Sequence, residues 1–152
     1  MSTAKLFKEI TKIVFSCFHI PIKILNKTGV TDKTYSQLHE LHQKYSDAGL
    51  AILGFPCNQF RQEPGTNTDI EQFARNKFDV KFDLFSKVNV NGSQADPLFN
   101  YLKTHKNAKG FLTNHVKWSW TKFLVDRNGV PQKRYGTNED PVTFEPDIKG
   151  LL

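Results

Sequence analysis

The side chains best suited to chemistry in this sequence are its two cysteines, because a thiol can act as a nucleophile, a redox group or a metal ligand. They are Cys17 and Cys57, and no Cys-x-x-Cys pair is present that would suggest a zinc ribbon or a dithiol redox motif. Two cysteines cannot form a disulfide framework, so a reducing compartment is expected. Cys57 has two interpretations, a nucleophile and a small buried residue at the end of a strand, and we favour the second.

The histidines do not form a cluster of the kind that binds a metal. His39 and His42 lie three residues apart on an expected helix, whereas His105 and His115 are distant from them in sequence. Structural zinc sites use four ligands at short, regular spacings. We therefore predict no metal site, and we expect His39 and His42 to lie on a solvated helix face.

Composition indicates one soluble globular domain. The chain has 152 residues, of which 38% are apolar and 24% charged. No apolar run approaches the roughly 20 residues that a membrane-spanning helix needs. The net charge of +6 is concentrated in the first 30 residues, where five lysines oppose one glutamate. Without an arginine cluster in the rest of the chain, nucleic acid is not an expected partner.

The basic, apolar N-terminal segment allows two interpretations. One is a mitochondrial presequence, although no arginine precedes Arg61. The other, which we favour, is one or two buried strands in residues 13–18 and 20–25. No signal-peptide cleavage site follows the apolar stretch. A cytoplasmic location is therefore expected, with the mitochondrion as the alternative.

From residue 31 onward the hydrophobic pattern predicts helices that alternate with strands. The first helix is expected to begin after Asp32 or Thr34, which would cap it, and to end before Gly49. Its apolar residues recur at helical spacing: Tyr35, Leu38, Leu41 and Tyr45. Residues 50–55 and 83–88 are expected strands.

Further helices are predicted after Thr66 or Asn67 and after Asp96, where Pro97 would occupy the first helical position. Their expected inward-facing residues are Ile70, Phe73 and Ala74 in the former helix and Leu98, Tyr101 and Leu102 in the latter. Residues 121–126 and 130–135 form an expected hairpin in which Asn128 and Gly129 adopt positive φ angles. Residues 145–152 form a last short helix. This order predicts an α/β fold with a mixed sheet flanked by helices.

Three blocks of the sequence match one known family. Residues 54–65, GFPCNQFRQEPG, resemble the FPCNQF-x-x-QEPG signature of glutathione peroxidases. Residues 82–92, in which FDLFSKV precedes VNG, and residues 116–126, VKWSWTKFLVD, resemble two further blocks of that family. The resemblance covers residues 28–152 and predicts a glutathione-peroxidase-like domain there, with residues 1–27 as a divergent N-terminal segment lacking a match to the family's first strands.

The resemblance implies a thioredoxin-like fold and an antioxidant enzyme of the response to oxidative stress. In such an enzyme a cysteine or selenocysteine at the start of the first helix reduces hydrogen peroxide or lipid hydroperoxides. The helix N-terminus lowers the pKa of this residue through its unpaired N–H groups and dipole. Glutathione or a thioredoxin then recycles the oxidised residue. Glutathione is accordingly the implied reducing co-substrate, and no bound cofactor is implied.

Four residues fall on the family's catalytic positions. The glutamine and tryptophan correspond to Gln62 and Trp118, which are intact, whereas the family's asparagine corresponds to Ser119. The reactive position falls on Thr28, within residues 26–31, NKTGVT. A threonine hydroxyl is not appreciably ionised near neutrality, so it cannot replace a thiolate without an activating base. The chain as written is therefore expected to lack peroxidase activity.

Other departures from the family pattern carry further expectations. The loop between Phe60 and Gln62 is one residue shorter than usual, which is expected to shift Gln62. Residues 73–82 lack the resolving cysteine of members that recycle through an internal disulfide, which implies dependence on glutathione. Residues 91–117 lack the insertion of tetrameric members, which implies a monomer. The monomeric, phospholipid-hydroperoxide type further implies contact with a membrane surface.

Three hypotheses for function remain open from the sequence. The first is a family member descended from a hydroperoxide reductase of the phospholipid-hydroperoxide type. The second is a catalytically inactive binding or regulatory protein on the same fold, which Thr28 and Ser119 favour. The third is that a UGA selenocysteine codon was spliced around near residue 28, so that the true residue there differs from the written one.

Overall fold

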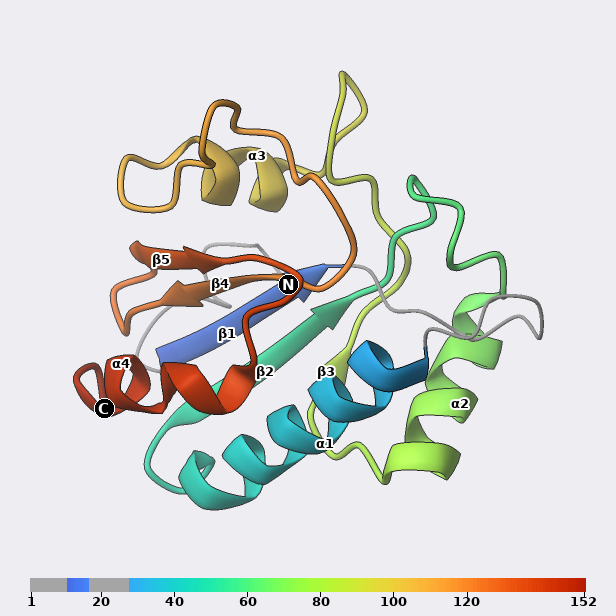
Figure 1. Ribbon diagram of the computed structural model, residues 1–152, viewed down its shortest axis with the longest axis horizontal. Coiled ribbons are helices and arrows are strands. Elements are labelled where there is room, and N and C mark those ends of the chain that lie inside the picture. The colour runs from blue at the N-terminus through green and yellow to red at the C-terminus, as the bar shows by residue number, and fades with distance from the viewer. Residues whose placement is uncertain (1–10, 17–27) are drawn as a thin grey trace.

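The computed structural model describes residues 11–16 and 28–152. These residues form one five-stranded sheet flanked by helices (Figure 1). The elements are, in chain order, β1 (Thr11–Ser16), α1 (Thr28–Tyr45), β2 (Leu50–Phe55), α2 (Asn67–Phe78), β3 (Asp83–Leu84), α3 (Pro97–Thr104), β4 (Thr121–Val125), β5 (Pro131–Tyr135), a 3-10 helix η1 (Pro141–Phe144) and α4 (Glu145–Lys149).

The strand order in the sheet is β3-β2-β1-β4-β5. β1, β2 and β3 run parallel, whereas β4 is antiparallel to both β1 and β5. β1 is the central strand, and Ile13 pairs with Ile52 of β2 on one side and Leu124 of β4 on the other. The predicted mixed sheet with flanking helices is confirmed. The first predicted N-terminal strand is confirmed in part as β1, and the second, at residues 20–25, lies outside the described residues.

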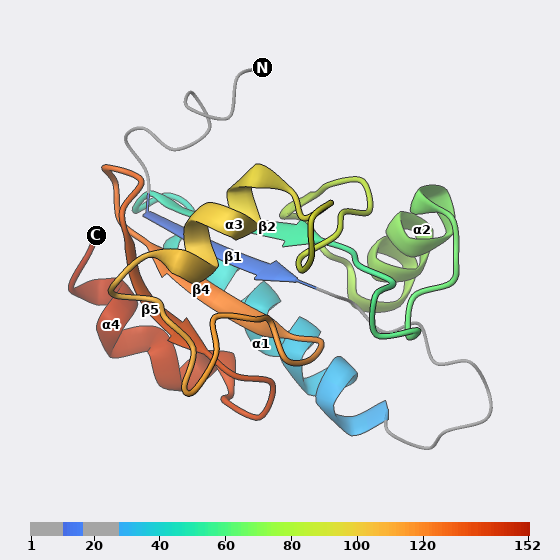
Figure 2. The ribbon, with the colours of Figure 1, turned by 90° about the horizontal axis from the view of Figure 1, so that it is seen from above.

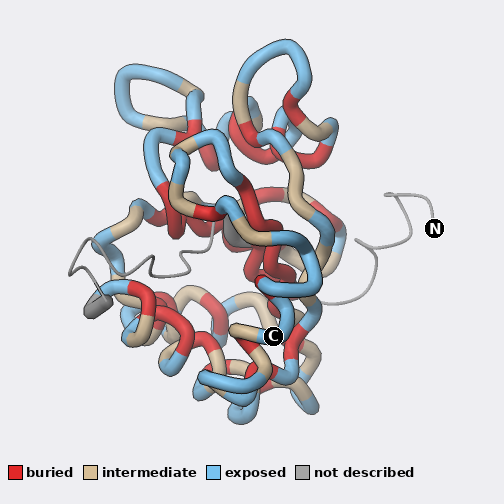
Figure 3. Tube along the Cα trace, turned by 90° about the vertical axis from the view of Figure 1, so that its right-hand side faces the viewer, coloured by how far each residue is buried: buried red, intermediate tan, exposed pale blue. Residues whose placement is uncertain are grey.

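Neighbouring residues along each strand point to opposite faces of the sheet, and each face has its own core. Ile13 and Leu124 face the cluster formed with α1, α2, η1 and α4, whereas Val14 and Phe123 face the cluster formed with α3. Figures 1 and 2 show the same layers, with α1 and α4 on one side of the sheet and α3 on the other. In Figure 3 the buried residues follow the sheet and the inner helix faces, and the loops at the top of the view are largely exposed.

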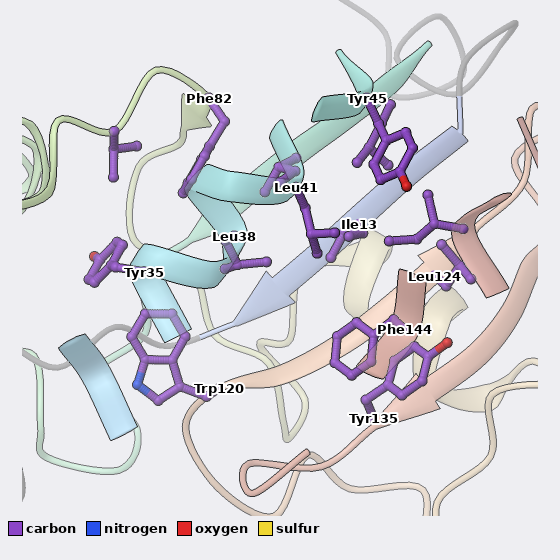
Figure 4. Close-up of a cluster of buried hydrophobic side chains, with 14 of the residues drawn as sticks. Ile13, Tyr35, Leu38, Leu41, Tyr45, Phe82, Trp120, Leu124, Tyr135 and Phe144 are labelled. Carbon is purple, nitrogen blue, oxygen red and sulfur yellow. The ribbon is translucent and has the colours of Figure 1, made fainter. Parts of the chain in front are cut away.

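The helical spacing predicted for α1 is confirmed, because Tyr35, Leu38, Leu41 and Tyr45 are all buried. Figure 4 shows Leu38 and Leu41 pointing from α1 toward β1, whereas the Tyr35 ring points away from that strand. The Tyr35 ring meets the Trp120 ring edge-on at 5.0 Å between centroids. This contact joins α1 to the segment that leads into β4.

On the other face, Leu98 and Leu102 of α3 are buried as predicted, but Tyr101 is wrongly predicted as an inward-facing residue. Its side chain is 44% exposed, and its hydroxyl donates to the carbonyl of Gly129 at 3.1 Å. An amphipathic tyrosine can satisfy the helical spacing from the rim of the core while its hydroxyl stays at the surface.

The predicted helix ends were correct only where a side chain caps the helix. Thr66 caps α2 in a capping box with Asp69, as predicted, and Asp96 caps α3 ahead of Pro97. Asp32 and Thr34 do not cap α1, because that helix begins one turn earlier, at Thr28.

Several element boundaries differ from the predicted ones. The first helix ends at Tyr45, and a turn follows that closes on Gly49 at a φ of 100°. β3 is only Asp83–Leu84, although the amide of Phe85 still donates to Gly54 at 2.8 Å. The last helix predicted at residues 145–152 is preceded by the 3-10 turn η1 and ends at Lys149.

In the predicted hairpin between β4 and β5, only Gly129 has a positive φ, of 81°, so the prediction for Asn128 is wrong. The Oδ1 atom of Asp126 accepts from the amides of Asn128 and Val130, both at 2.9 Å. This Asx-type turn orders the connection without a left-handed residue at Asn128.

The division of the chain into residues 1–27 and 28–152 stays a prediction. The structure adds that Thr11–Ser16, from the first of these segments, forms the central strand of the sheet.

Candidate active site

A pocket of about 500 Å³ opens where the first turn of α1 meets the segment that precedes β4. It is lined by Val30, Thr31, Gln62, Trp118, Ser119, Trp120, Thr137 and Asn138. Three of the four residues predicted for the catalytic site, Gln62, Trp118 and Ser119, therefore meet in one place. Their catalytic roles stay predictions.

The fourth predicted residue, Thr28, is the first residue of α1. Val30 and Thr31, in the same first turn of the helix, line the pocket. The N-terminal end of an 18-residue helix is thus directed at this site. Unpaired N–H groups and the helix dipole favour negative charge at such an end, and no acidic side chain lies in the first turn to oppose an incoming anion.

The loop after β2 presents Gln62 to the pocket. Arg61 adopts a φ of 56°, which is uncommon for a residue with a side chain, and its amide donates to the carbonyl of Asn58 at 2.9 Å. The Oδ1 atom of Asn58 accepts from the amide of Glu63 at 3.0 Å. This turn accommodates the shortened loop, and Gln62 still lines the pocket. The Oε1 atom of Gln62 is buried and has no hydrogen-bond partner among the described residues, so an acceptor in the pocket is available to a donor.

Trp118 and Ser119 reach the pocket from the irregular segment before β4. The Trp118 side chain is 49% exposed, and its ring lies 5.6 Å from the ring of Phe60. Ser119 is buried, and its carbonyl accepts from the Thr137 hydroxyl at 2.6 Å. Trp120 adopts a φ of 60° and lies in the core. This backbone turn separates a half-exposed indole from a fully buried one two residues away.

Sequence reasoning missed the wall of the pocket that Thr137 and Asn138 form. Lys122 of β4 anchors this loop, because its Nζ donates to the carbonyls of Gly136 (3.0 Å), Thr137 (3.3 Å) and Glu139 (2.9 Å). Burial lowers the pKa of Lys122 to about 8, although the nearby carboxylates of Glu139 and Asp140 act in the opposite direction. The position of Lys122 within the WSWTKFLVD block was the one signal in the sequence for such an anchor.

Cys57 is buried, as the favoured interpretation requires, and it belongs to the core cluster beneath α3. It does not line the pocket. Cys17 lies outside the described residues. Within residues 11–16 and 28–152, no group of three or more His, Cys, Asp or Glu side chains could hold a metal ion. The two histidines predicted to lie on a solvated face, His39 and His42, are half-buried instead.

A second, basic pocket of about 600 Å³ shares Trp118, Thr137 and Asn138 with the first. Its lining includes the cationic residues Lys109, Lys117 and Arg134. Phe111 also lines this pocket and is 82% exposed, and its neighbour in sequence, Leu112, is 87% exposed. In the part of the chain that is described, no helix combines the length and the apolar character needed to cross a membrane.

The arrangement of sheet, helix N-terminus and pocket defines the thioredoxin-like class. A thiol:disulfide interchange protein of the thioredoxin family from Chlorobium tepidum has the same fold, with a TM-score of 0.63 at 10% identity, over 97% of this chain and 83% of that one. The crystal structure of T. cruzi GPX1 is more similar, with a TM-score of 0.71 at 27% identity, over 99% of this chain and 86% of that one.

Sequence comparison gives the family within this class. The family model described as glutathione peroxidase matches residues 9–103. The chain is 49% identical over 134 residues to the phospholipid hydroperoxide glutathione peroxidase of Bos taurus, covering 88% of this chain and 68% of the bovine protein. It is 48% identical to a probable phospholipid hydroperoxide glutathione peroxidase of Helianthus annuus, covering 86% of this chain and 72% of the plant protein. The chain belongs to the glutathione peroxidase family.

The match of the family model corrects one expectation about the N-terminal segment. The sequence blocks gave no match before residue 26, whereas the family model begins at residue 9 and so includes β1. A short buried strand carries few distinguishing residues, and apolar residues exchange freely within it. Its family character is therefore difficult to see from short motifs.

Proposed function

We propose that the pocket is a hydroperoxide-reducing site of the phospholipid-hydroperoxide type in which residue 28 is the reactive position. The observation that carries this proposal is the meeting of Gln62, Trp118 and Ser119 beside the first turn of α1. The amide and indole N–H groups of such residues can stabilise an anionic nucleophile and orient a peroxide. The buried Oε1 atom of Gln62 offers an acceptor for the O–H group of a hydroperoxide.

The proposed chemistry needs a thiolate or selenolate at residue 28. A thiolate attacks the terminal peroxide oxygen, a sulfur–oxygen bond forms as the O–O bond breaks, and the alcohol leaves with a proton from solvent. One glutathione then converts the sulfenic acid to a mixed disulfide and releases water. A second glutathione releases the thiolate and leaves as oxidised glutathione. The hydroxyl of Thr28 cannot begin this cycle, because it is not ionised near neutrality.

We predict that the chain with Thr28 has negligible glutathione-dependent peroxidase activity. A coupled assay with hydrogen peroxide and with a phospholipid hydroperoxide measures this directly. The Cys57→Ser variant is the control for the buried thiol. Turnover at the level of an active family enzyme, retained in Cys57→Ser, would contradict the role given to residue 28. Turnover that disappears in Cys57→Ser would instead make Cys57 the nucleophile.

A second function is favoured by the intact pocket around an unreactive residue. A pocket that keeps Gln62 and Trp118 without a nucleophile can bind a hydroperoxide or its alcohol without turning it over. This is the binding or regulatory alternative. Saturable binding of a lipid hydroperoxide to the unmodified chain, without consumption of the ligand, would support it.

We further propose a cytoplasmic monomer that takes its substrate from a membrane surface with glutathione as reductant. The absence of a cysteine in residues 73–82 supports glutathione, and the relatives named as phospholipid hydroperoxide glutathione peroxidases support the substrate class. The surface beside the pocket suits an anionic membrane, because Phe111 and Leu112 are exposed next to Lys109 and Lys117. Apolar side chains enter the interface while lysines attract anionic headgroups.

Binding to vesicles of phosphatidylcholine and phosphatidylserine should depend on this surface. Lys117→Glu is expected to weaken binding by about fivefold or more, since each lysine near an anionic surface contributes about 1 kcal/mol. Leu112→Ser is expected to weaken it by a similar factor. Lys149→Glu makes the same charge change on α4, on the opposite side of the sheet, and is the matched control. Equal loss in Lys117→Glu and Lys149→Glu would contradict a defined docking surface.

A further inference from the structure

We infer that Asn91 is a positioning residue that sets where Trp118 stands in the pocket by holding the backbone of Val116. The side chain of Asn91 makes two hydrogen bonds to that one residue. Its Nδ2 donates to the Val116 carbonyl at 2.8 Å, and its Oδ1 accepts from the Val116 amide at 2.9 Å. This pair of bonds satisfies both backbone groups of Val116, as a neighbouring β-strand would.

Gln59 in turn holds Asn91 in place. Its Oε1 accepts from the amides of Val90 at 2.8 Å and Asn91 at 2.9 Å, and its Nε2 donates to the carbonyl of Asn91 at 2.9 Å. The backbone of Asn91 is therefore bound on both sides by a single amide side chain. A fully bonded network of this kind permits one arrangement and excludes others.

The contacts close into a ring that joins the three sequence blocks. Gln59 belongs to the first block, Asn91 to the second, and Val116 and Trp118 to the third. Phe60, the neighbour of Gln59, completes the ring through its contact with the Trp118 indole at 5.6 Å. The indole is thus located by its backbone on one side and by an aromatic ring on the other.

Trp118 needs this support because the core does not enclose its side chain. It lies in the irregular segment between α3 and β4, and its side chain is half-exposed rather than enclosed by the core. Nearby bonds hold the ends of the segment, with Arg134 donating to the carbonyls of Asn114 and His115 and Thr121 donating to the carbonyl of Trp118. Asn91 is the described side chain that fixes the residue between them, Val116.

The test uses tryptophan fluorescence of the chain itself. Trp120 is 1% exposed, so acrylamide quenching reports mainly on Trp118. In Asn91→Ala we expect the quenching constant to rise about twofold and the emission to shift to longer wavelength, because local opening exposes the half-covered indole. Asn107→Ala is the matched control, since Nδ2 of Asn107 also donates to a distant backbone carbonyl, that of Pro131 at 3.2 Å. Unchanged quenching in a folded Asn91→Ala variant would overturn the inference.

Asn91→Asp gives a second test that does not depend on how well the alanine variant folds. The new carboxylate keeps an acceptor for the Val116 amide but has no donor for the Val116 carbonyl. Protonation restores a donor, so quenching should return toward the native value as the pH falls from about 7 to about 4. The native chain over the same pH range is the control. A pH profile identical to that of the native chain would contradict the inference.

The consequence for catalysis rests on the proposed function and is tested separately. In the Thr28→Cys/Ser119→Asn background, adding Asn91→Ala is expected to lower kcat at least about tenfold, because a small displacement of a group around the reacting atoms is costly. Adding Asn107→Ala should leave kcat unchanged. If that background has no activity, the proposed function fails, while the fluorescence results still decide whether Asn91 positions Trp118.

Discussion

The double variant Thr28→Cys/Ser119→Asn is expected to show glutathione-dependent peroxidase activity that exceeds the sum of the two single variants. The cysteine supplies the nucleophile at the N-terminus of α1, where the helix favours the thiolate. The asparagine supplies N–H donors on a longer arm than the serine hydroxyl. Because donor and nucleophile act as a unit, Ser119→Asn should raise the turnover of Thr28→Cys by about tenfold to a hundredfold and change nothing by itself.

Coupled turnover with hydrogen peroxide and a phospholipid hydroperoxide measures this effect in all four combinations. Thr28→Ser/Ser119→Asn is the matched control, because it adds the amide and keeps a hydroxyl at residue 28 but supplies no thiol. Gln62→Ala in the double variant should remove most of the gained activity, since Gln62 lines the same pocket. A double variant that is folded, has a titratable thiol at residue 28 and shows no turnover would mean that the pocket does not support the reaction.

The sequence predicted the part of the fold that depends on regular spacing. The buried positions of α1 follow a helical period, and the run at Leu50–Phe55 is apolar throughout, as a strand covered on both faces requires. The ends of elements were less predictable, because they depend on contacts made by distant residues. Thr11 illustrates this, since its amide donates to Gly49 and its hydroxyl to Leu151, and neither partner is near it in sequence.

The candidate site likewise contains residues that the sequence predicted and residues that it did not. Gln62, Trp118 and Ser119 were predicted because each lies inside a motif, and the structure places all three around one pocket. Thr137 and Asn138 were not predicted, because the loop that carries them is held by Lys122 from 14 to 17 residues away. Apart from its place in the WSWTKFLVD block, a lysine in a strand gives no indication that its ammonium group will be buried against three carbonyls.

That buried ammonium group leads to the second large expected effect. Replacing Lys122 with Met leaves the carbonyls of Gly136, Thr137 and Glu139 without their shared donor. An unsatisfied buried acceptor costs about 1–3 kcal/mol, and the loop can recover part of this by moving toward water. We expect Lys122→Met to lower the free energy of unfolding by about 2–4 kcal/mol near neutral pH. Lys133→Met is the matched control, because Lys133 makes an exposed ion pair with Asp147, and its loss should change stability by less than about 0.5 kcal/mol.

The difference in unfolding free energy between the native chain and Lys122→Met should depend on pH. This dependence distinguishes a buried ammonium group from a purely steric role of the side chain. Burial lowers the pKa of Lys122 from 10.5 in the unfolded chain to about 8 in the folded one. Between these values the unfolded chain binds more protons, so the contribution of Lys122 to stability increases as the pH rises. Burial also lowers the pKa of Lys12 to about 8. Because Lys12 is present in both proteins, its contribution to stability cancels in the difference between them. The stability gap between the native chain and Lys122→Met should therefore widen by about 1–2 kcal/mol between about pH 8 and about pH 10. Urea unfolding of both proteins across this range measures the gap, and a gap that stays constant or narrows would show that Lys122 is not held as a desolvated cation.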